Sequence, residues 1–143
     1  MIKKKISKIF VPLDGSENSV RGLETAITLA RNCGATITGF YSIYAPPHSE
    51  FKGIGSVGKA FNREIKKFMK EAKTMSAENG IVFTDKIARG EVGYNIIKAS
   101  HGKAKYDMIV MGSRGRSNTK EIFFGSVSNY VIHTSKIPVV IVK

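Results

Sequence analysis

Two short segments rich in glycine and serine carry the residue types that bind phosphate groups. The first is residues 112–115 and the second residues 125–128, and nine residues separate Gly115 from Gly125. Glycine allows the backbone to approach a ligand and to adopt a positive φ, and we expect both at Gly112. If a helix begins after Gly125, with Ser126 as its N-cap, its first amides lack partners within the helix and attract anions. This arrangement suits a polyphosphate.

Charged residues near these segments support the same interpretation. Arg114, Arg116 and Lys120 lie within or between the two segments and would neutralise phosphate charge. Asp14 ends an apolar run near the start of the chain. This residue is either a ligand-binding carboxylate or a cap for the turn that follows, since aspartate is common in such turns. The GxxxxGK[ST] pattern is absent from the sequence, which argues against a fast, motor-type NTPase.

Apolar segments that alternate with helical patterns must position these residues. The expected strands are residues 8–13, 35–43, 81–88, 108–111 and 138–142. Alternating strands and helices are typical of an α/β fold, with an open parallel sheet and helices on both faces. The first, fourth and fifth segments are almost continuously apolar, as expected of strands buried on both sides. Ligands of such sheets bind at the carboxyl ends of strands, and Asp14 and Gly112 both lie at such ends.

The expected helices are amphipathic. Apolar residues recur at steps of three or four over residues 20–30, and Gly34 follows as a stop. In residues 59–75 the apolar positions are Phe61, Ile65, Phe68, Ala72 and Met75. A basic row is displaced from them by two residues and consists of Lys59, Arg63, Lys66, Lys70 and Lys73. Two residues correspond to about 200° on a helix, so we interpret this row as a solvated face. Shorter helices are expected after Glu91 and over residues 127–134.

The composition is that of a globular protein, with 143 residues, 42% hydrophobic and 24% charged. We expect a single domain over residues 1–143, with a core over about 8–142 and a frayed basic arm over 1–7. No apolar run could span a bilayer and Cys33 is the single cysteine, so a cytoplasmic protein is expected. The net charge of +12 favours nucleic acid, anionic lipid or phosphorylated ligands without choosing between them. Residues 44–58 predict a loop long enough to act as a lid.

Three segments together resemble the nucleotide-binding branch of the universal stress protein family. They are the spacing G-x2-G-x9-G-S that begins at Gly112, residues 11–16 (VPLDGS) and residues 107–117 (DMIVMGSRGRS). The resemblance extends from about residue 8 to residue 142, and Asn118 departs from it where the family often has glycine. It implies an adenine nucleotide alpha-hydrolase-like, Rossmann-like fold of five strands in the order 3-2-1-4-5. It also implies ATP, or AMP or ADP, with Mg²⁺ or Mn²⁺ bound through the phosphates.

The resemblance further assigns roles to residues of this chain. It implies that Asp14 lies by the nucleoside, Ser42 by the adenine and Gly112 by the ribose, with the later positions at the phosphates. The nucleotide site that we expect is Pro12, Asp14, Ser42, Met111, Gly112, Arg114, Gly115, Gly125, Ser126 and Val127. No catalytic residue is assigned. The resemblance, and the uninterrupted apolar pattern of residues 138–142 from Pro138 onward, predict a homodimer through the last strand.

The function favoured by these features is that of an ATP-binding regulatory or stress-response protein with slow or no hydrolysis. The alternative is an adenylating or ATP-hydrolysing enzyme of the same superfamily. Adenylating members often carry a Ser-Gly-Gly-x-Asp-Ser loop after the first strand, where this chain has Asp14 followed by GSENS. A nucleic-acid-binding protein is a third interpretation, motivated by the charge, but the aromatic residues are not interleaved with the basic row.

Overall fold

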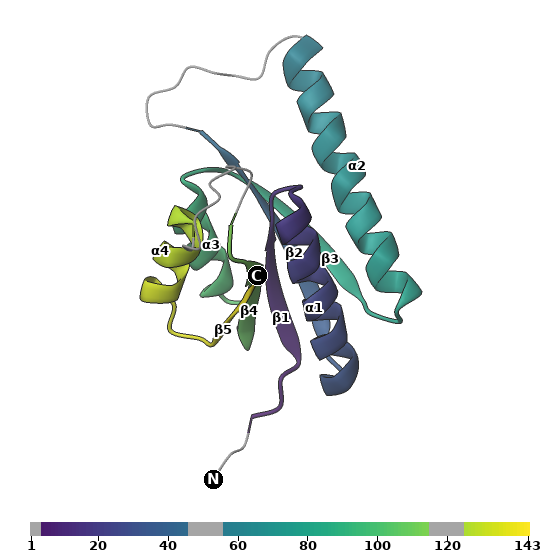
Figure 1. Cartoon of the computed structure of the whole chain (residues 1–143), viewed down its shortest axis with the longest axis vertical. Coiled ribbons are helices and arrows are strands. Elements are labelled where there is room, and N and C mark those ends of the chain that lie inside the picture. The colour runs from purple at the N-terminus through teal and green to yellow at the C-terminus, as the bar shows by residue number, and fades with distance from the viewer. Residues whose placement is uncertain (1–3, 46–55, 115–124) are drawn as a thin grey trace.

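The computed structural model describes residues 4–45, 56–114 and 125–143. Its elements are β1 (Lys8–Leu13), α1 (Glu17–Cys33), β2 (Thr36–Tyr44), α2 (Ser56–Glu78), β3 (Phe83–Gly90), α3 (Val92–Ser100), β4 (Met108–Gly112), α4 (Ser126–Thr134) and β5 (Val139–Val142). The strands form a parallel sheet in the order β3-β2-β1-β4-β5 (Figure 1). Helices α1 and α2 pack on one face, and α3 and α4 pack on the other. The α/β fold and strand order expected from the sequence are confirmed.

The central strands are apolar at successive positions because the sheet has a hydrophobic core on each face. In β1, Ile9 and Val11 pack with residues of α1 and α2, whereas Phe10 packs with residues of α3 and α4. β4 divides in the same way, with Val110 on the first face and Ile109 on the second. β5 differs from the expectation of a strand buried on both sides. All its residues are only half-buried, because β5 is the edge of the sheet.

The ends of α1 follow its capping residues. Ser16 is the N-cap, and its hydroxyl oxygen accepts a hydrogen bond from the Ser19 amide at 3.1 Å. Gly34 ends the helix in the left-handed conformation, with φ 68°, as glycine commonly does. At Gly22, an added Cβ would lie 3.1 Å from the backbone nitrogen of Gly112. The start of α1 therefore lies directly against the carboxyl end of β4.

α2 begins earlier than the sequence predicts, at Ser56, so the last residues assigned to the loop are helical. Tyr44, the first residue assigned to that loop, instead ends β2. The predicted lid otherwise falls on residues 46–55, which lie outside the described residues.

The buried side of α2 is rotated from the expected one. Its buried residues are Ile65, Met69, Ala72 and Ser76, whereas Phe61 is 36% exposed. The basic row of α2 (Lys59, Arg63, Lys66, Lys70 and Lys73) is exposed at every position. α2 packs over β2 and β3, near one edge of the sheet. Only a narrow face of α2 is therefore buried.

β3 begins at Phe83 rather than at Ile81. The difference arises because the end of α2 uses the backbone amides that precede the strand. The Gly80 amide donates to the Ala77 carbonyl and the Ile81 amide donates to the Ser76 carbonyl, both at 2.9 Å. Gly80 makes this turn possible with φ 73°, a conformation that costs glycine little.

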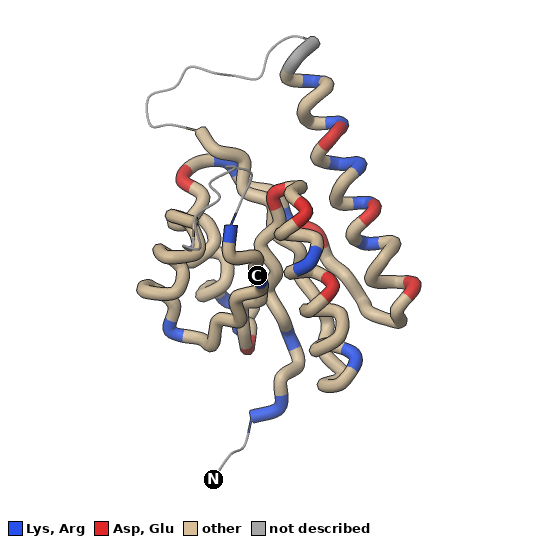
Figure 2. Tube along the Cα trace, viewed as in Figure 1, with Lys and Arg blue, Asp and Glu red and all other residues tan. Residues whose placement is uncertain are grey.

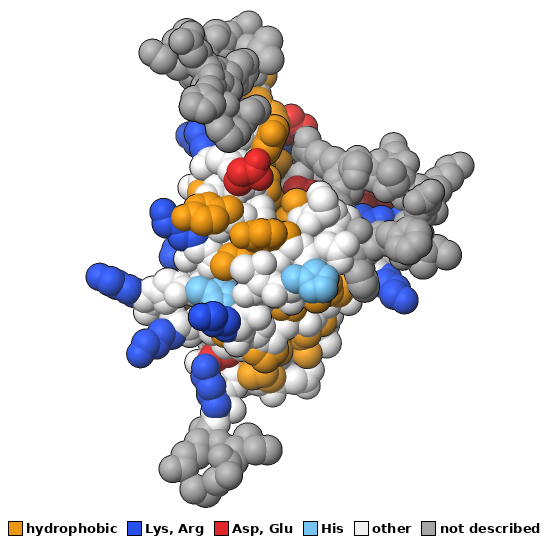
Figure 3. Space-filling view, turned by 90° about the vertical axis from the view of Figure 1, so that its left-hand side faces the viewer, with side chains coloured by type: hydrophobic (Ala, Val, Ile, Leu, Met, Phe, Trp, Pro, Cys, Tyr) orange, Lys and Arg blue, Asp and Glu red, His pale blue; other side chains and the backbone are white. Residues whose placement is uncertain are grey.

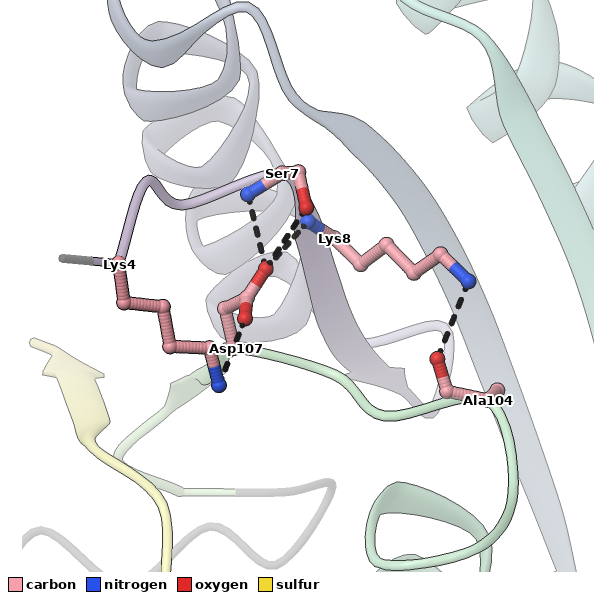
Figure 4. Close-up of polar contacts among 5 residues, drawn as sticks. All are labelled: Lys4, Ser7, Lys8, Ala104 and Asp107. Carbon is pink, nitrogen blue, oxygen red and sulfur yellow. Dashed lines mark hydrogen bonds and ion pairs between the residues drawn. The ribbon is translucent and has the colours of Figure 1, made fainter.

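The N-terminal arm is attached to the sheet by Asp107, which immediately precedes β4 (Figure 4). One oxygen of its carboxylate accepts hydrogen bonds from the amides of Ser7 and Lys8 at 2.8 and 2.9 Å and from the Ser7 hydroxyl at 3.1 Å. The other oxygen pairs with the Lys4 ammonium group at 3.0 Å. The expectation of a frayed arm is therefore wrong from Lys4 onward, because a buried carboxylate holds that part of the arm in place.

Lys and Arg are spread along the N-terminal arm, α2 and the loops, and α2 carries acidic residues between its basic ones (Figure 2). In residues 4–45, 56–114 and 125–143, no helix combines the length and apolar character needed to cross a membrane.

Candidate functional site

A cavity of about 260 Å³ lies at the carboxyl ends of β1, β2 and β4. The strand order reverses between β1 and β4, and α/β proteins bind ligands at such a reversal. Residues proposed from the sequence that line the cavity are Pro12, Asp14, Ser42, Met111, Gly112, Arg114, Gly125, Ser126 and Val127. Gly115 lies outside the described residues. The fold thus brings the described members of the predicted site together from three strands, one helix and the segments after β1 and β4.

The N-terminus of α4 forms one end of the cavity. Gly125 is the N-cap, with φ −62° and ψ 162°, and Ser126 is the first helical residue. The expectation that Ser126 is the N-cap is wrong by one position, because the extended Gly125 supplies the carbonyl that accepts from the Asn129 amide at 3.0 Å. The amides that open the helix have no acceptor within it and carry the positive end of its dipole. Ser126 and Val127 present this end to the cavity.

Ser113 ties the end of β4 to the start of α4. Its carbonyl accepts hydrogen bonds from the Gly125 amide and from the Ser128 hydroxyl, both at 2.8 Å. Its own amide donates to the Val142 carbonyl at the end of β5, also at 2.8 Å. Both Ser113 and Ser128 are buried. The two glycine-containing segments are therefore held to each other by hydrogen bonds made before any ligand arrives.

Gly112 is required by a neighbouring helix. The expected positive φ is wrong: the described glycines with positive φ are Gly15, Gly34, Gly80 and Gly90. A Cβ at Gly112 would instead lie 2.8 Å from the backbone oxygen of Asn18 in the first turn of α1 and would also strike its side chain. The close approach at this glycine is thus made by α1.

Asn18 connects three parts of the site and is itself buried, at 8% exposure. Its side-chain oxygen accepts a hydrogen bond from the Arg114 amide at 2.7 Å. Its side-chain nitrogen donates to the Val142 carbonyl at 3.1 Å. The amide group therefore fixes the backbone where the chain leaves β4, and Arg114 lies at the cavity as a result.

Asp14 caps the turn after β1 and also lines the cavity, so its position is compatible with both roles that the sequence left open. One carboxylate oxygen caps the turn by accepting from the Ser16 amide at 2.9 Å. The residue is half-buried. Its carbonyl accepts a hydrogen bond from the Tyr41 hydroxyl at 3.1 Å, which fixes the backbone of the turn.

Part of the cavity wall is apolar. Phe40 and Ile96 are buried there, and Val92 lies beside them at the start of α3. Ser42 adds a polar group near the end of β2, and its hydroxyl oxygen accepts from the Asn95 side chain at 3.1 Å. The same Asn95 nitrogen donates to the Arg89 carbonyl at 3.0 Å. The cavity thus combines apolar side chains with the backbone amides that open α4.

Sequence reasoning did not find several residues of the site, namely Asn18, Ser19, Phe40, Asn95 and Ile96. It placed Ser113 and Ser128 in the two glycine-containing segments but did not find the hydrogen bond between them. Phe40 and Ile96 follow the periodicity of buried residues, which gives no reason to separate a cavity wall from the core. The side chains of Asn18 and Ser128 bond to positions far away in the chain, and one sequence carries no signal for such pairs. Ser19 bonds locally, to Ser16 and Asp14.

Metal-ligating side chains are sparse in this region. In the part of the chain that the structure describes, no three or more His, Cys, Asp or Glu side chains gather as a metal site. Among the described lining residues the charged side chains are Asp14 and Arg114.

Comparison with known proteins identifies the family of this chain. The model of the universal stress protein family matches residues 5–143. The chain belongs to the universal stress protein family. It is 32% identical to the universal stress protein YxiE of Bacillus subtilis over 96% of this chain and 99% of that one. The structure of UspA from Lactobacillus plantarum superposes on this universal stress protein with a TM-score of 0.85 at 18% identity, covering 99% and 100% of the two chains.

A second similar structure holds a nucleotide. A universal stress protein from Archaeoglobus fulgidus, in complex with dAMP, resembles this chain with a TM-score of 0.73. The two are 20% identical, and the match covers 98% of this chain and 100% of the other.

Proposed function

We propose that this universal stress protein binds an adenine nucleotide, ATP above all, in the cavity between β1 and β4. One observation carries the proposal: a cavity at the reversal of strand order is lined both by apolar side chains and by the N-terminus of α4 together with Arg114. Such a cavity matches a ligand that is aromatic at one end and anionic at the other. The dAMP complex of the Archaeoglobus relative supports an adenine nucleotide as that ligand.

The residues divide between the parts of the nucleotide. Phe40 and Ile96 provide an apolar surface for the adenine ring, and the backbone near Ser42 provides polar groups at its edge. Asp14 lies beside the ribose. The amides of Ser126 and Val127 donate to the phosphates, and the positive charge of Arg114 lies at the same cavity.

The donor set fits a metal ion held mainly by the nucleotide. Mg²⁺ usually keeps several waters and binds one or two carboxylates together with phosphate oxygens. Asp14 supplies a carboxylate in the cavity and is the residue that would hold the ion. A bound Mg²⁺ or Mn²⁺ would neutralise phosphate charge.

We infer a regulatory role in the cytoplasm, with slow or no hydrolysis of ATP. Fast phosphoryl transfer needs a residue that orients the attacking water or acceptor. Asp14 is the carboxylate among the described lining residues. One of its oxygens accepts from the Ser16 amide, and the proposal assigns the residue to the metal ion rather than to a water. The protein is then suited to report the presence of the nucleotide through its conformation or its partners.

The decisive experiment removes a single backbone donor. Ser126 is the first residue of α4 and follows a residue with ψ 162°, so proline fits there. The substitution removes the amide hydrogen together with the side-chain hydroxyl. We expect Ser126→Pro to weaken ATP binding about tenfold in calorimetric titration and to leave adenosine binding unchanged.

Two matched controls accompany this variant. Ser126→Ala removes the hydroxyl but keeps the amide, and Glu17→Pro places proline at the first residue of α1, outside the cavity. Both should bind ATP as the unmodified protein does. An unmodified protein without affinity for ATP would overturn the proposed function, and equal affinity in Ser126→Pro would overturn the assignment of the phosphates to α4.

We further propose a homodimer through β5. Its residues are half-buried at the edge of the sheet, and Pro138 before them is exposed. The side of the molecule that carries α4 and β5 shows hydrophobic side chains at its surface (Figure 3). An apolar edge of this kind aggregates unless it is paired, and a two-fold axis would pair it with its own copy.

Sedimentation at micromolar concentration tests the dimer. We expect a dimer for the unmodified protein and weaker association for the double variant Val140→Lys with Ile141→Asp. Since both side chains also contact the cores, circular dichroism must show that the variant is folded. A monomeric unmodified protein would refute the proposal.

A further inference from the structure

The edge of the sheet opposite β5 is formed by β3, and its backbone pattern is set by the pairing with β2. The Ile37 amide donates to the Val82 carbonyl at 3.0 Å, and the Ala45 amide donates to the Gly90 carbonyl at 3.1 Å. In a parallel ladder, alternate residues of a strand direct their backbone groups to the same neighbour. The even-numbered residues of β3 therefore face β2.

The odd-numbered residues of β3 direct their amides and carbonyls away from the sheet. They are Phe83, Asp85, Ile87 and Arg89. No strand of the described residues pairs with this side of β3. Ile87 is 44% exposed, and Asp85 is exposed as well. The Arg89 carbonyl accepts from the Asn95 side chain, so the outward row of backbone donors and acceptors runs from Phe83 to the Arg89 amide. This row is long enough to pair with a short strand.

Cations lie on both faces of this edge. On the face of α3, the Lys86 ammonium group lies over the Tyr106 ring, 5.9 Å from its centroid. On the face of α2, Arg89 donates a hydrogen bond to the Asn62 side chain at 3.4 Å. Asp85 is the acidic residue of the strand itself.

The basic row of α2 belongs to the same surface. The flank of α2 with Phe61, Glu64 and Glu71 faces a second cavity of about 200 Å³, which Gly15 and Tyr41 also line. That flank is turned towards α1 and the end of β1. The basic row is on the opposite flank, beyond Asn62, which contacts β3. Figure 1 shows α2 as the outermost element on the β3 side of the molecule.

We propose that the outer edge of β3 and the basic row of α2 together bind an extended acidic segment of a partner protein. The segment would add as a strand to β3 through backbone hydrogen bonds, and its carboxylates would meet the cations on both faces. Charged side chains on an edge strand also prevent self-association. The excess of cations on this edge repels the same edge of a second copy. The same cations attract a strand that carries negative charge.

The first test uses a capped peptide, about as long as β3 and with a fluorescent label, in which pairs of glutamates alternate with pairs of valines so that each face of the strand carries carboxylates. We expect saturable binding by fluorescence anisotropy, weakened by added salt, and slower hydrogen exchange at Asp85, Ile87 and Arg89. A lysine–valine peptide of equal length should not bind. If the acidic peptide does not bind, or protects other amides, the proposal is overturned.

The second test separates strand addition from simple charge attraction. Ile87→Pro removes an amide that faces outward and leaves the β2 ladder intact, since proline is tolerated at that position of an edge strand. We expect binding about tenfold weaker, whereas Ile87→Thr, which keeps the amide, should bind as before. Circular dichroism confirms the fold of both. Equal binding by Ile87→Pro and Ile87→Thr would overturn strand addition.

The third test addresses the charges. The double variant Lys66→Glu with Lys70→Glu should bind the peptide at least tenfold more weakly. The control Lys98→Glu with Lys136→Glu makes the same change at exposed residues elsewhere and should bind the peptide as before. A single-stranded oligonucleotide that binds the surface tightly and is unaffected by Ile87→Pro, while the peptide fails to compete with it, would identify a nucleic-acid surface and overturn the proposal. Dimerisation abolished by Ile87→Pro would overturn it in favour of a second copy.

Discussion

Replacement of Asp107 by asparagine should destabilise the protein in a manner that depends on pH. Burial by itself raises the pKa of Asp107, but hydrogen bonds from Ser7, Lys4 and Lys8 outweigh it and lower the pKa from 3.8 to about 2. At about 1.4 kcal/mol per pKa unit this corresponds to about 2.5 kcal/mol of stability. Lys4 is 72% exposed and its ion pair is screened by solvent, so we expect about 2 kcal/mol.

The sign follows from the direction of the shift. Because the folded-state pKa lies below the unfolded value, the stabilisation is fully present above about pH 4 to 5 and is lost as the pH falls towards about 2. The asparagine side chain of the variant would remain neutral throughout. Denaturant titration should therefore show Asp107→Asn less stable by about 2 kcal/mol at pH 7, with a difference that shrinks as the pH approaches 2.

The exposed Asp85 offers a matched control, because Asp85→Asn changes the net charge equally without touching the N-terminal arm. Its stability should follow that of the unmodified protein at each pH. If the difference in the free energy of unfolding between Asp107→Asn and the unmodified protein stayed constant from pH 7 to pH 2.5, the carboxylate charge would not be what holds the arm.

Three further variants follow from the contacts. Gly112→Ala places a Cβ 2.8 Å from the Asn18 carbonyl oxygen, and denaturant titration should show a loss of about 1–3 kcal/mol; unchanged stability would contradict the contact. Asn18→Ala should weaken ATP binding in calorimetric titration and leave adenosine binding unchanged, since it releases the Arg114 amide. An equal loss of affinity for both ligands would indicate general unfolding instead. Gly80→Ala, with φ 73° and nothing within 4 Å of the new Cβ, should cost about 1 kcal/mol, and Gly80→Asn should cost less; no loss would mean that the turn rearranges.

The architecture could be predicted from the sequence because the coverage of each strand by helices determines which of its positions are apolar. β1 and β4 are covered on both sides, so their uninterrupted apolar runs were sufficient to identify them. The errors lie where residues outside the local sequence pattern determine where a strand begins or how exposed it is. β3 begins late because the end of α2 uses the Gly80 and Ile81 amides, and β5 is half-exposed because no further strand of the described residues covers it.

The sequence predicted which residues line the candidate site but not the contacts that explain why those residues are there. Glycine at 112 was expected for the sake of a ligand, yet the described contact is with Asn18, a residue that no local pattern connects to it. Asn18 also binds the Arg114 amide and the Val142 carbonyl, so the glycine makes room for the residue that shapes the loop. A substitution at Gly112 therefore changes the scaffold before it changes any ligand contact. Loss of nucleotide binding in a Gly112 variant would be poor evidence for a direct contact, whereas loss in Ser126→Pro, which alters one outward amide, would be good evidence.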